Sequence, residues 1–437
     1  MDFDLLAWNV IRELRLAKIV PNDGPKREPE QEKEALVTQS FRKLSILGST
    51  GSIGRQCLAV VESLPGRFGV VALAAGSNLD ELAAQIERHR PEIVSVGDAA
   101  KADALAQKLR VNGVSPLPAI HHGREGMLAV GTHPAADIVV SAAVGVVGLE
   151  ATYEAIKLGK TIALSNKEVL VAAGELVMAA AKKAGRELLP VDSEHNAVHQ
   201  CLRGGEHGEV RRLVLTASGG PFRKTPLAAL QSVTPQQALA HPNWRMGNRI
   251  TIDSATMMNK GFEVIEARWL FGVQPNQIDV VIHPQSTIHS MVEFVDGSVL
   301  AQLGPTDMRL PLQYALTYPE RVASNGGLAL DWSKLRRLDF AKVSTRRFPC
   351  LRLAKEAMKK GGALPCALNA ADEVAVAAFL ERRLPFLGIS EVIERVLART
   401  PRTRFEKMDD VLTADNEARR MAKEEVDRLA VTAAAAS

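Results

Sequence analysis

The stretch "KLSILGSTGSIGRQCLAVVESL", residues 43–64, runs from a short apolar segment through a glycine-rich turn into a helical pattern. Gly48, Gly51 and Gly54 give this turn the spacing GxxGxxG. Glycines in such a turn allow the backbone to approach a pyrophosphate, whose charge is stabilised at the helix N-terminus. The spacing alone also fits an ordinary strand–helix turn, so its meaning depends on the chain that follows.

Strand and helix patterns alternate after this turn. Further apolar strands are predicted at "FGVVALAAG", "EIVSVG", "DIVVSAAV", "TIALS" and "ELLPVD", with helical segments between them. This alternation predicts a mostly parallel sheet with helices on both faces. Strand-like segments recur after residue 190, and from about Cys350 the pattern is helical. We therefore expect an α/β protein with an N-terminal Rossmann-like parallel-sheet domain, a central α/β domain and a C-terminal helical bundle.

The composition excludes several classes of protein. The 54 basic and 50 acidic residues are scattered, and their net charge of +4 does not predict a nucleic-acid-binding face. No apolar segment of the sequence reaches the roughly 18 residues that a membrane span requires. The four cysteines lie far apart, which is typical of reduced thiols in a cytosolic protein. We thus expect a cytoplasmic protein with no nucleic-acid partner and no membrane partner.

Two carboxylates follow the last predicted strand of the series, in "LLPVDSEHNA" (188–197). Asp192 and Glu194 are two residues apart, so at the end of a strand their side chains share one face. Two carboxylates on one face repel unless a cation or a shared proton lies between them. Asp192 or Ser193 is equally compatible with a helix N-cap, so this stretch does not decide between a metal site and a cap.

A third carboxylate, Glu263, lies in "DSATMMNKGFEVIEARWLF" (253–271). We interpret this segment as a polar loop that enters an amphipathic helix, with Glu263 in about its first turn. Ser254, Thr256, Asn259 and Lys260 place several donors near the helix start, which suits a phosphate. Three carboxylates with oxygen-only ligands suit Mg²⁺ or Mn²⁺ better than zinc. The alternative for Glu263 is simple complementarity to the helix dipole.

Other polar clusters follow predicted strands. In "LSNKEVL" (164–170), Ser165 and Glu168 fit a capping box, whereas Asn166 and Lys167 are not needed for capping. A lysine at a strand end is able to hold an oxygen-rich substrate. In "TASGGPF" (216–222), Ser218 is compatible with an anion contact or with a simple turn.

The loop "HPNWRMG" (241–247) holds His241, Trp244 and Met246. A tryptophan there is compatible with a lid over a site or with an anchor in the core. Further on, we interpret His289 as structural and keep His283, at a strand end, as a weaker candidate for the site.

Taken together, these motifs closely resemble the 1-deoxy-D-xylulose 5-phosphate reductoisomerase family from about residue 42 to about residue 430. The shared motifs are "GSTGSIG", "NKE", "PVDSEHNA", "SGGPF", "HPNW-MG", "DSATMMNKG-E", "HPQS-IHSMV" and "ALNAADE". The resemblance implies an NADPH-dependent, homodimeric enzyme that rearranges and reduces 1-deoxy-D-xylulose 5-phosphate, a small phosphosugar, to 2-C-methyl-D-erythritol 4-phosphate in the non-mevalonate isoprenoid pathway.

The resemblance also implies roles for individual residues. The residues expected to bind NADPH are Gly48, Thr50, Gly51, Ser52, Ile53, Gly54, Gly76, Ser77, Asn78, Asn166, Glu168 and Gly247. Those expected to bind substrate are Lys167, Ser193, Glu194, Ser218, His241, Ser254, Asn259, Lys260 and Glu263. Asp192, Glu194 and Glu263 would hold Mg²⁺ or Mn²⁺, and the expected catalytic residues are Lys167, Glu263 and His241. The segment around Trp244 and Met246 would close over the site.

Residues 1–40 lie outside the resemblance, and their amphipathic start and polar continuation predict an N-terminal extension made of a helix and a flexible linker. The other domains are as follows. Residues 41–190 would bind NADPH, and residues 191–318 would form the catalytic, metal- and substrate-binding domain. Residues 319–349 would be a linker, and residues 350–437 the C-terminal helical domain.

The chemistry leaves alternatives open. Cleavage of the C3–C4 bond in a retro-aldol step and a direct 1,2-shift would both give the branched aldehyde that NADPH then reduces. A dehydrogenase or a metal-dependent aldolase acting on another phosphosugar would use the same glycine turn or the same carboxylates. A nucleotide-sensing binding protein would have no use for three carboxylates beside an anion site.

Overall fold

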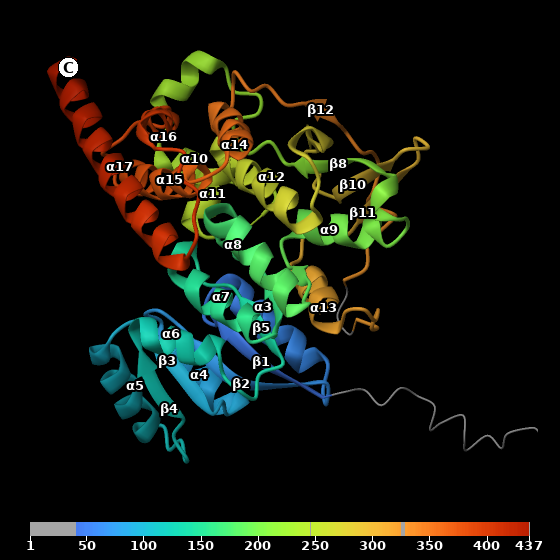
Figure 1. The fold of residues 1–437 in the computed structure, drawn as a ribbon, viewed down its shortest axis with the longest axis vertical. Coiled ribbons are helices and arrows are strands. Elements are labelled where there is room, and N and C mark those ends of the chain that lie inside the picture. Colours follow the sequence, from blue (N-terminus) through green and yellow to red (C-terminus); the bar gives the residue numbers. More distant parts are fainter. Residues whose placement is uncertain (1–40, 245, 325–327, 437) are drawn as a thin grey trace, which may run out of the picture. The chain divides into compact units, whose positions relative to one another are not determined.

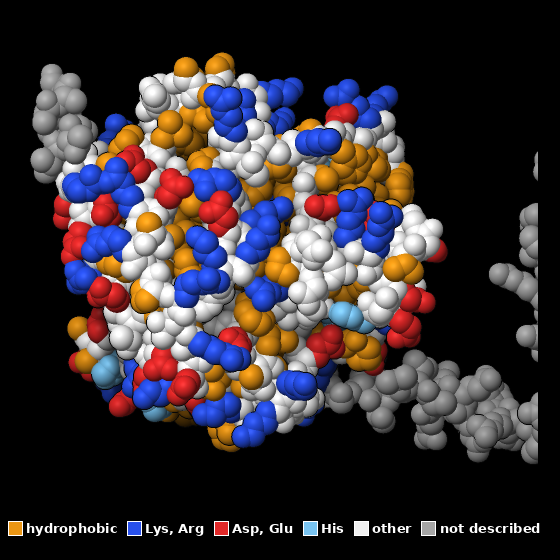
Figure 2. Space-filling view, turned by 45° about the horizontal axis from the view of Figure 1, so that its top comes forward, with side chains coloured by type: hydrophobic (Ala, Val, Ile, Leu, Met, Phe, Trp, Pro, Cys, Tyr) orange, Lys and Arg blue, Asp and Glu red, His pale blue; other side chains and the backbone are white. Residues whose placement is uncertain are grey.

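A computed structural model describes residues 41–244, 246–324 and 328–436, and it describes side chains as far as residue 430 (Figure 1). The helix and linker expected within residues 1–40 lie outside the described residues. No described helix has both the length and the apolarity needed to cross a membrane. On the face that Figure 2 shows, basic and acidic side chains are interspersed over the described part of the surface.

Seven parallel strands form the first sheet, in the order β4-β3-β2-β1-β5-β6-β7. The strands are β1 (Arg42–Leu47), β2 (Phe68–Ala74), β3 (Ile93–Val96), β4 (Ala119–His122), β5 (Ile138–Ser141), β6 (Thr161–Leu164) and β7 (Leu188–Pro190). Nearly all residues of the central strands are buried, which is why they appear in the sequence as continuous apolar runs. The predicted parallel sheet is confirmed.

Helices cover both faces of this sheet because successive strand residues point to opposite sides. Ile46 joins the hydrophobic core beneath one set of helices, and Leu47 joins the core beneath the other. The first set is α3 (Ser52–Ser63), α4 (Leu79–His89), α5 (Ala99–Val111) and α13 (Arg309–Thr317). The second set is α6 (Gly123–Gly131), α7 (Leu149–Lys157) and α8 (Glu168–Ala184).

The strand order reverses between β1 and β5, and the glycine turn lies at this point. Gly48 has φ +87°, and a Cβ there would lie 2.5 Å from the carbonyl oxygen of Ala142, which follows β5. A Cβ on Gly54 would lie 2.4 Å from the carbonyl oxygen of Gly48. The turn therefore needs glycine for close backbone approach, and this packing sets the carboxyl ends of the two central strands side by side.

The close contact at Gly54 predicts a specific loss of stability. Gly54→Ala should lower the free energy of unfolding by roughly 1–3 kcal/mol, because the added methyl group forces the turn and α3 apart. Urea unfolding measures this change. Gly208→Ala is the control, since a Cβ there would meet no atom within 4 Å. Equal effects of the two substitutions would contradict the expectation.

The second sheet is mixed and has the order β11-β10-β8-β9-β12. Its strands are β8 (Val210–Ala217), β9 (Ile278–Ile282), β10 (Ile288–Phe294), β11 (Val299–Leu303) and β12 (Ala341–Lys342). Helix α9 (Ser193–Leu202) follows β7 and packs on β10 and β11, so it connects the end of the first sheet to the second. The described 3₁₀ helices are η1 (Gly145–Gly148), η2 (His207–Glu209), η3 (Leu227–Ser232) and η4 (Pro275–Gln277).

The segment expected to be an irregular polar loop is largely helical. It contains α11 (Asn248–Thr256) and the start of α12 (Met258–Phe271), and it follows the short helix α10 (Pro235–Ala238). Met257, in the left-handed region at φ 64°, separates α11 from α12. Glu263 consequently lies in the second turn of α12 rather than the first. The helix is also not amphipathic as expected, because α12 is buried on most sides and includes the buried Glu266.

The C-terminal helices are α14 (Pro349–Lys360), α15 (Leu364–Leu380), α16 (Gly388–Arg399) and α17 (Met408–Ala436). Helix α15 contacts the other three and also α8 (Figure 1). Leu368 and Phe379 of α15 belong to the same hydrophobic core as Leu213 of β8 and Phe262 of α12. The C-terminal helices therefore complete the core of the second sheet instead of forming a core of their own.

A buried charge cluster joins these helices to α8 and α11. Arg249 of α11 donates to Glu168 at 3.0 Å, to Glu373 at 2.9 Å and to Asn369 at 2.8 Å. Beside it, burial raises the pKa of Asp253 to about 6. Burial and the neighbouring Asp253 raise the pKa of Asp372 well above its usual value. The two carboxyl groups thus favour a shared proton.

This carboxyl pair predicts a pH-dependent stability. A carboxyl whose pKa is raised on folding keeps its proton after the unfolded chain has lost it, so stability falls as the pH rises from about 4 to about 6. Asp372→Asn replaces the shared proton with a permanent amide donor. Its free energy of unfolding should rise relative to the unmodified protein across this window, by on the order of 1–3 kcal/mol.

Urea unfolding at intervals between these pH values tests the expectation. Asp279→Asn is the matched control, because Asp279 forms a surface ion pair with Arg212. A difference between Asp372→Asn and the unmodified protein that stays constant with pH would rule out a proton shared in the folded state.

Candidate active site

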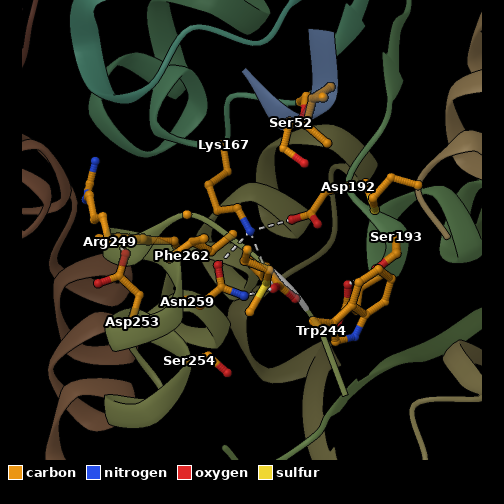
Figure 3. A pocket seen from close by; sticks show the side chains of 18 of the residues that line it. Ser52, Lys167, Asp192, Ser193, Trp244, Arg249, Asp253, Ser254, Asn259 and Phe262 are labelled. Carbon is orange, nitrogen blue, oxygen red and sulfur yellow. Dashed lines mark hydrogen bonds and ion pairs between the residues drawn. The ribbon is translucent and has the colours of Figure 1, made fainter. Parts of the chain in front are cut away.

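A cavity of about 890 Å³ lies at the carboxyl ends of the central strands of the first sheet. The turn after β1, the segment after β5 and the β6–α8 junction line one side of it. The β7–α9 junction, the loop before α11, and helices α11 and α12 line the rest (Figure 3). Ligands of open α/β sheets bind at such a reversal of strand order, so this cavity is the expected place for chemistry.

Asp192, Glu194 and Glu263 converge in this cavity. One carboxylate oxygen of each lies within 4.8 Å of the corresponding oxygens of the other two. Asp192 occupies the N-cap position of α9, yet its side chain makes no capping hydrogen bond to a described residue. The predicted N-cap position is therefore confirmed, but the Asp192 side chain does not cap the helix. Three carboxylate oxygens from two elements fit a hard divalent cation such as Mg²⁺ or Mn²⁺.

Two buried lysines lie among these carboxylates. Lys167 Nζ is 2.6 Å from Asp192 Oδ2 and 2.8 Å from Asn259 Oδ1, and Figure 3 shows the side chain pointing toward both. Lys260 Nζ is 2.8 Å from Glu194 Oε1 and also pairs with Glu263. Three carboxylates against two ammonium groups leave one negative charge in excess, which favours a bound cation.

The pKa values reflect this crowding. Burial lowers the pKa of Lys167, but Asp192 and Glu263 outweigh burial and hold that pKa well above its usual value. Lys167 is therefore a cation and a hydrogen-bond donor rather than a base. Burial and the neighbouring Glu194 raise the pKa of Glu263 to about 7, against the opposing effect of Lys260 and Lys167. Of the three carboxylates, Glu263 is thus the one placed to accept a proton near neutral pH.

Donors for an anion also line the cavity. Ser218 Oγ lies 3.0 Å from His241 Nε2. His241 Nδ1 accepts hydrogen bonds from the backbone N–H groups of Trp244 at 2.9 Å and Asn243 at 3.2 Å. Burial lowers the pKa of His241, so the ring is neutral and its proton is on Nε2. His241 therefore donates toward Ser218. Ser254, Asn259 and Lys260 line the same cavity.

The residues predicted to bind the cofactor divide into three groups. Those that line the cavity are Gly51, Ser52, Ile53, Asn166, Glu168 and Gly247. Gly48, Thr50 and Gly54 shape the turn behind them, whereas Gly76, Ser77 and Asn78 lie exposed at the end of β2, outside the cavity lining. The Asn78 side chain caps α4 by accepting from the Glu81 N–H at 3.2 Å.

The capping box proposed for Ser165 and Glu168 is not formed. Helix α8 begins at Glu168 without a side-chain capping bond from the described residues. Glu168 pairs with Arg249 instead. Asn166 donates to the carbonyl oxygen of Gly145 at 2.7 Å, which fixes the segment after β5 beside the cavity.

The loop before α11 faces the cavity. Trp244 is half-buried, lines the cavity, and its ring lies 6.3 Å from that of His289 (Figure 3). Asn243 ties this loop to the turn after β9, donating to the carbonyl oxygen of Pro284 at 2.6 Å. Closure of this loop over a ligand stays a prediction.

The site hypothesis for His283 is wrong. Its ring is fully buried, its Nδ1 donates to the carbonyl oxygen of Asp339 at 2.9 Å, and it stacks on Phe340. The imidazole therefore fixes the loop before β12 and is not available to a ligand.

Sequence reasoning missed other residues that line the cavity, notably Arg249 and the turn that contains Asp307, Met308 and Arg309. Asp307 and Arg309 form a two-residue ion pair at the cavity wall. The motif "GPTDMRLP" carried a charged pair directly after a predicted strand, which was the available signal.

Three family models match this chain. The family model described as 1-deoxy-D-xylulose 5-phosphate reductoisomerase matches residues 44–174. The model of that enzyme's C-terminal domain matches residues 188–271, and the model described as DXP reductoisomerase C-terminal domain matches residues 303–421. The 1-deoxy-D-xylulose 5-phosphate reductoisomerase of Solibacter usitatus is 52% identical over 386 residues, covering 88% of this chain and 97% of the relative. That of Pseudomonas aeruginosa strain UCBPP-PA14 is 52% identical, covering 87% and 97%.

Solved structures agree. A DOX-P reductoisomerase in complex with NADPH, fosmidomycin and magnesium superposes with a TM-score of 0.84 at 39% identity, covering 89% of this chain and 99% of that one. The enzyme from Zymomonas mobilis in complex with NADPH gives a TM-score of 0.82 at 43% identity, with the same coverage. The resemblance found in the sequence is thereby confirmed, and the chain belongs to the 1-deoxy-D-xylulose 5-phosphate reductoisomerase family.

Proposed function

We propose that this protein catalyses the NADPH- and divalent-metal-dependent conversion of 1-deoxy-D-xylulose 5-phosphate to 2-C-methyl-D-erythritol 4-phosphate in the non-mevalonate isoprenoid pathway. One observation carries the proposal: three carboxylates and a set of anion donors share one cavity with the glycine turn at the sheet's reversal point. The solved relatives that bind NADPH, fosmidomycin and magnesium support the same cofactors here.

Asp192, Glu194 and Glu263 would hold the metal. A divalent cation bound there would polarise the substrate carbonyl as a Lewis acid. Ser193 lies between two of these ligands and donates to Glu194 at 2.5 Å, so it is positioned beside the substrate oxygens. Lys167, which keeps its positive charge, would stabilise negative charge that develops on those oxygens.

The substrate phosphate would lie against Ser218, Ser254, Asn259 and Lys260, with the His241 N–H orienting the Ser218 hydroxyl. NADPH, which would supply hydride to the rearranged aldehyde, would occupy the side lined by Gly51–Ile53, Asn166, Glu168 and Gly247. In this arrangement residues 41–190 serve the cofactor and residues 191–318 serve the metal and substrate. The C-terminal helices from residue 350 support both through the Arg249 cluster.

A steady-state assay tests the proposal. The protein should oxidise NADPH in the presence of 1-deoxy-D-xylulose 5-phosphate only when Mg²⁺ or Mn²⁺ is added. Asp192→Asn should lower kcat/KM about 100-fold or more, because loss of a metal ligand removes several kcal/mol of transition-state stabilisation. Asp279→Asn on β9 is the control and should retain full activity. Metal-independent oxidation, or none with this substrate, would refute the function.

We further propose a cytoplasmic homodimer. NADPH dependence and four unpaired buried cysteines favour a reducing compartment. Strand β11 forms one edge of the second sheet, and its outer residues Val299 and Leu300 are 50% and 40% exposed. An exposed apolar edge strand is a surface on which a second copy pairs favourably.

Light scattering coupled to size exclusion measures this assembly. The unmodified protein should elute as a dimer, and Val299→Lys should shift it toward monomer, because a buried lysine opposes pairing at the edge. Val111→Lys is the control, since Val111 is 80% exposed on α5, away from this sheet. A Val299→Lys protein that remains fully dimeric would exclude β11 from the interface.

A further inference from the structure

His195 is a fully buried imidazole between α9 and α12. Its Nε2 lies 2.8 Å from the backbone carbonyl oxygen of Glu263. Because a carbonyl oxygen only accepts, Nε2 carries a hydrogen and donates. Its Nδ1 faces two carboxylates, Glu266 Oε2 at 3.3 Å and Asp192 Oδ2 at 3.6 Å. Nδ1 is therefore in close polar contact with one carboxyl group from α12 and one from the start of α9.

Glu266 is the closer of the two carboxyl groups that face Nδ1 of this ring. It lies three residues after Glu263 on α12 and is fully buried. Neither of its carboxylate oxygens accepts a hydrogen bond from a residue within the described parts of the chain. An unpaired carboxyl group at such depth is costly, so the contact with His195 Nδ1 at 3.3 Å explains why Glu266 is tolerated. Phe271 stacks on the ring at 6.2 Å and 14°, which restricts its rotation.

The position of this pair matters because the proposed metal ligands come from two elements. Asp192 and Glu194 belong to the start of α9, whereas Glu263 belongs to α12. His195 stands on α9, donates to the backbone of Glu263 and points its other nitrogen toward Asp192. One buried ring thus connects the two halves of the ligand set.

We propose that Glu266 is a positioning residue that holds His195 in the orientation that fixes Asp192 and the Glu263 backbone, and so sets the affinity of the site for its divalent cation. The inference rests on the proposed function, since it requires that the three carboxylates bind a metal. Outer carboxylates that orient a histidine commonly act on metal affinity in this way.

Direct Mn²⁺ binding to the full chain without substrate, followed by electron paramagnetic resonance, tests the role. Glu266→Gln keeps the shape of the side chain and replaces its carboxyl group with an amide, and it should raise the Kd for Mn²⁺ roughly 10- to 100-fold. The Kd for NADPH, followed by fluorescence, should change less than about 2-fold. Glu293→Gln is the matched control, because Glu293 is also a buried carboxylate, paired with Arg212 on the second sheet. It should leave both constants unchanged.

A double-variant comparison shows whether Glu266 acts through the ring. His195→Gln should weaken Mn²⁺ binding, and adding Glu266→Gln to it should cause little further loss, because effects through one shared residue are not additive. Full additivity would overturn the proposal. If Glu266→Gln does not fold, Glu266→Asp carries the same test, with a smaller rise in the Kd for Mn²⁺.

Three other results would also overturn it: an unchanged Kd for Mn²⁺ in a folded Glu266 variant, an equal weakening of NADPH binding, or two Mn²⁺ ions per unmodified chain with one lost in Glu266→Gln. The last result would make Glu266 a ligand, in the cluster that it forms with Asp192 and His195. If the Glu266 variants change the Kd for Mn²⁺ as expected but the unmodified protein does not oxidise NADPH with the proposed substrate, the proposed function is refuted and the positioning role stands.

Discussion

The repulsion between three carboxylates in one buried cavity is the constraint around which this site is built. At separations within 4.8 Å and away from bulk water, such charges destabilise the fold strongly unless cations lie between them. Lys167 from the β6–α8 junction and Lys260 from α12 meet that need in part. Lys260 reaches Glu263 within α12, but Asp192 and Glu194 meet their lysine partners only when α9, α12 and the β6–α8 junction come together. The assembly of these elements and the formation of the site therefore depend on each other.

The first sheet and the meeting of the three carboxylates were predictable because they depend on local patterns. Buried strands appear as apolar runs, and the motifs around Asp192 and Glu263 match a family whose membership the comparisons confirm. Helix α11 was not predictable from apolar periodicity, since polar Thr251 and Asp253 share its buried side with Ile252. The side chains of Asp192 and Glu168 do not cap their helices for a related reason: they meet lysine and arginine partners from distant segments, which local spacing does not reveal.

The Arg249 cluster also brings together charged residues from distant segments, at the periphery of the site. One guanidinium contacts the start of α8 and the middle of α15, and it stands only two residues after Gly247 of the loop that holds Trp244. Burial lowers the pKa of Arg249, but the neighbouring carboxylates, among which Glu168 has the largest effect, hold it above its usual value. The charge of Arg249 is therefore permanent. The C-terminal helices thus support the cavity without lining it, through a charge network and a core shared with β8 and α12.

Helix α13 has a consequence for how the chain is made. Its residues Leu312, Ala315 and Leu316 lie in the same core as α3 and β1, although some 250 residues separate them from α3 in the sequence. Asn196 of α9 donates to the carbonyl oxygen of Pro311 at 3.2 Å, which anchors this return. A ribosome that has released only the first sheet leaves an apolar face of α3 open to water. The N-terminal part is therefore a late-completed unit, and nascent chains depend on protection until α13 has emerged.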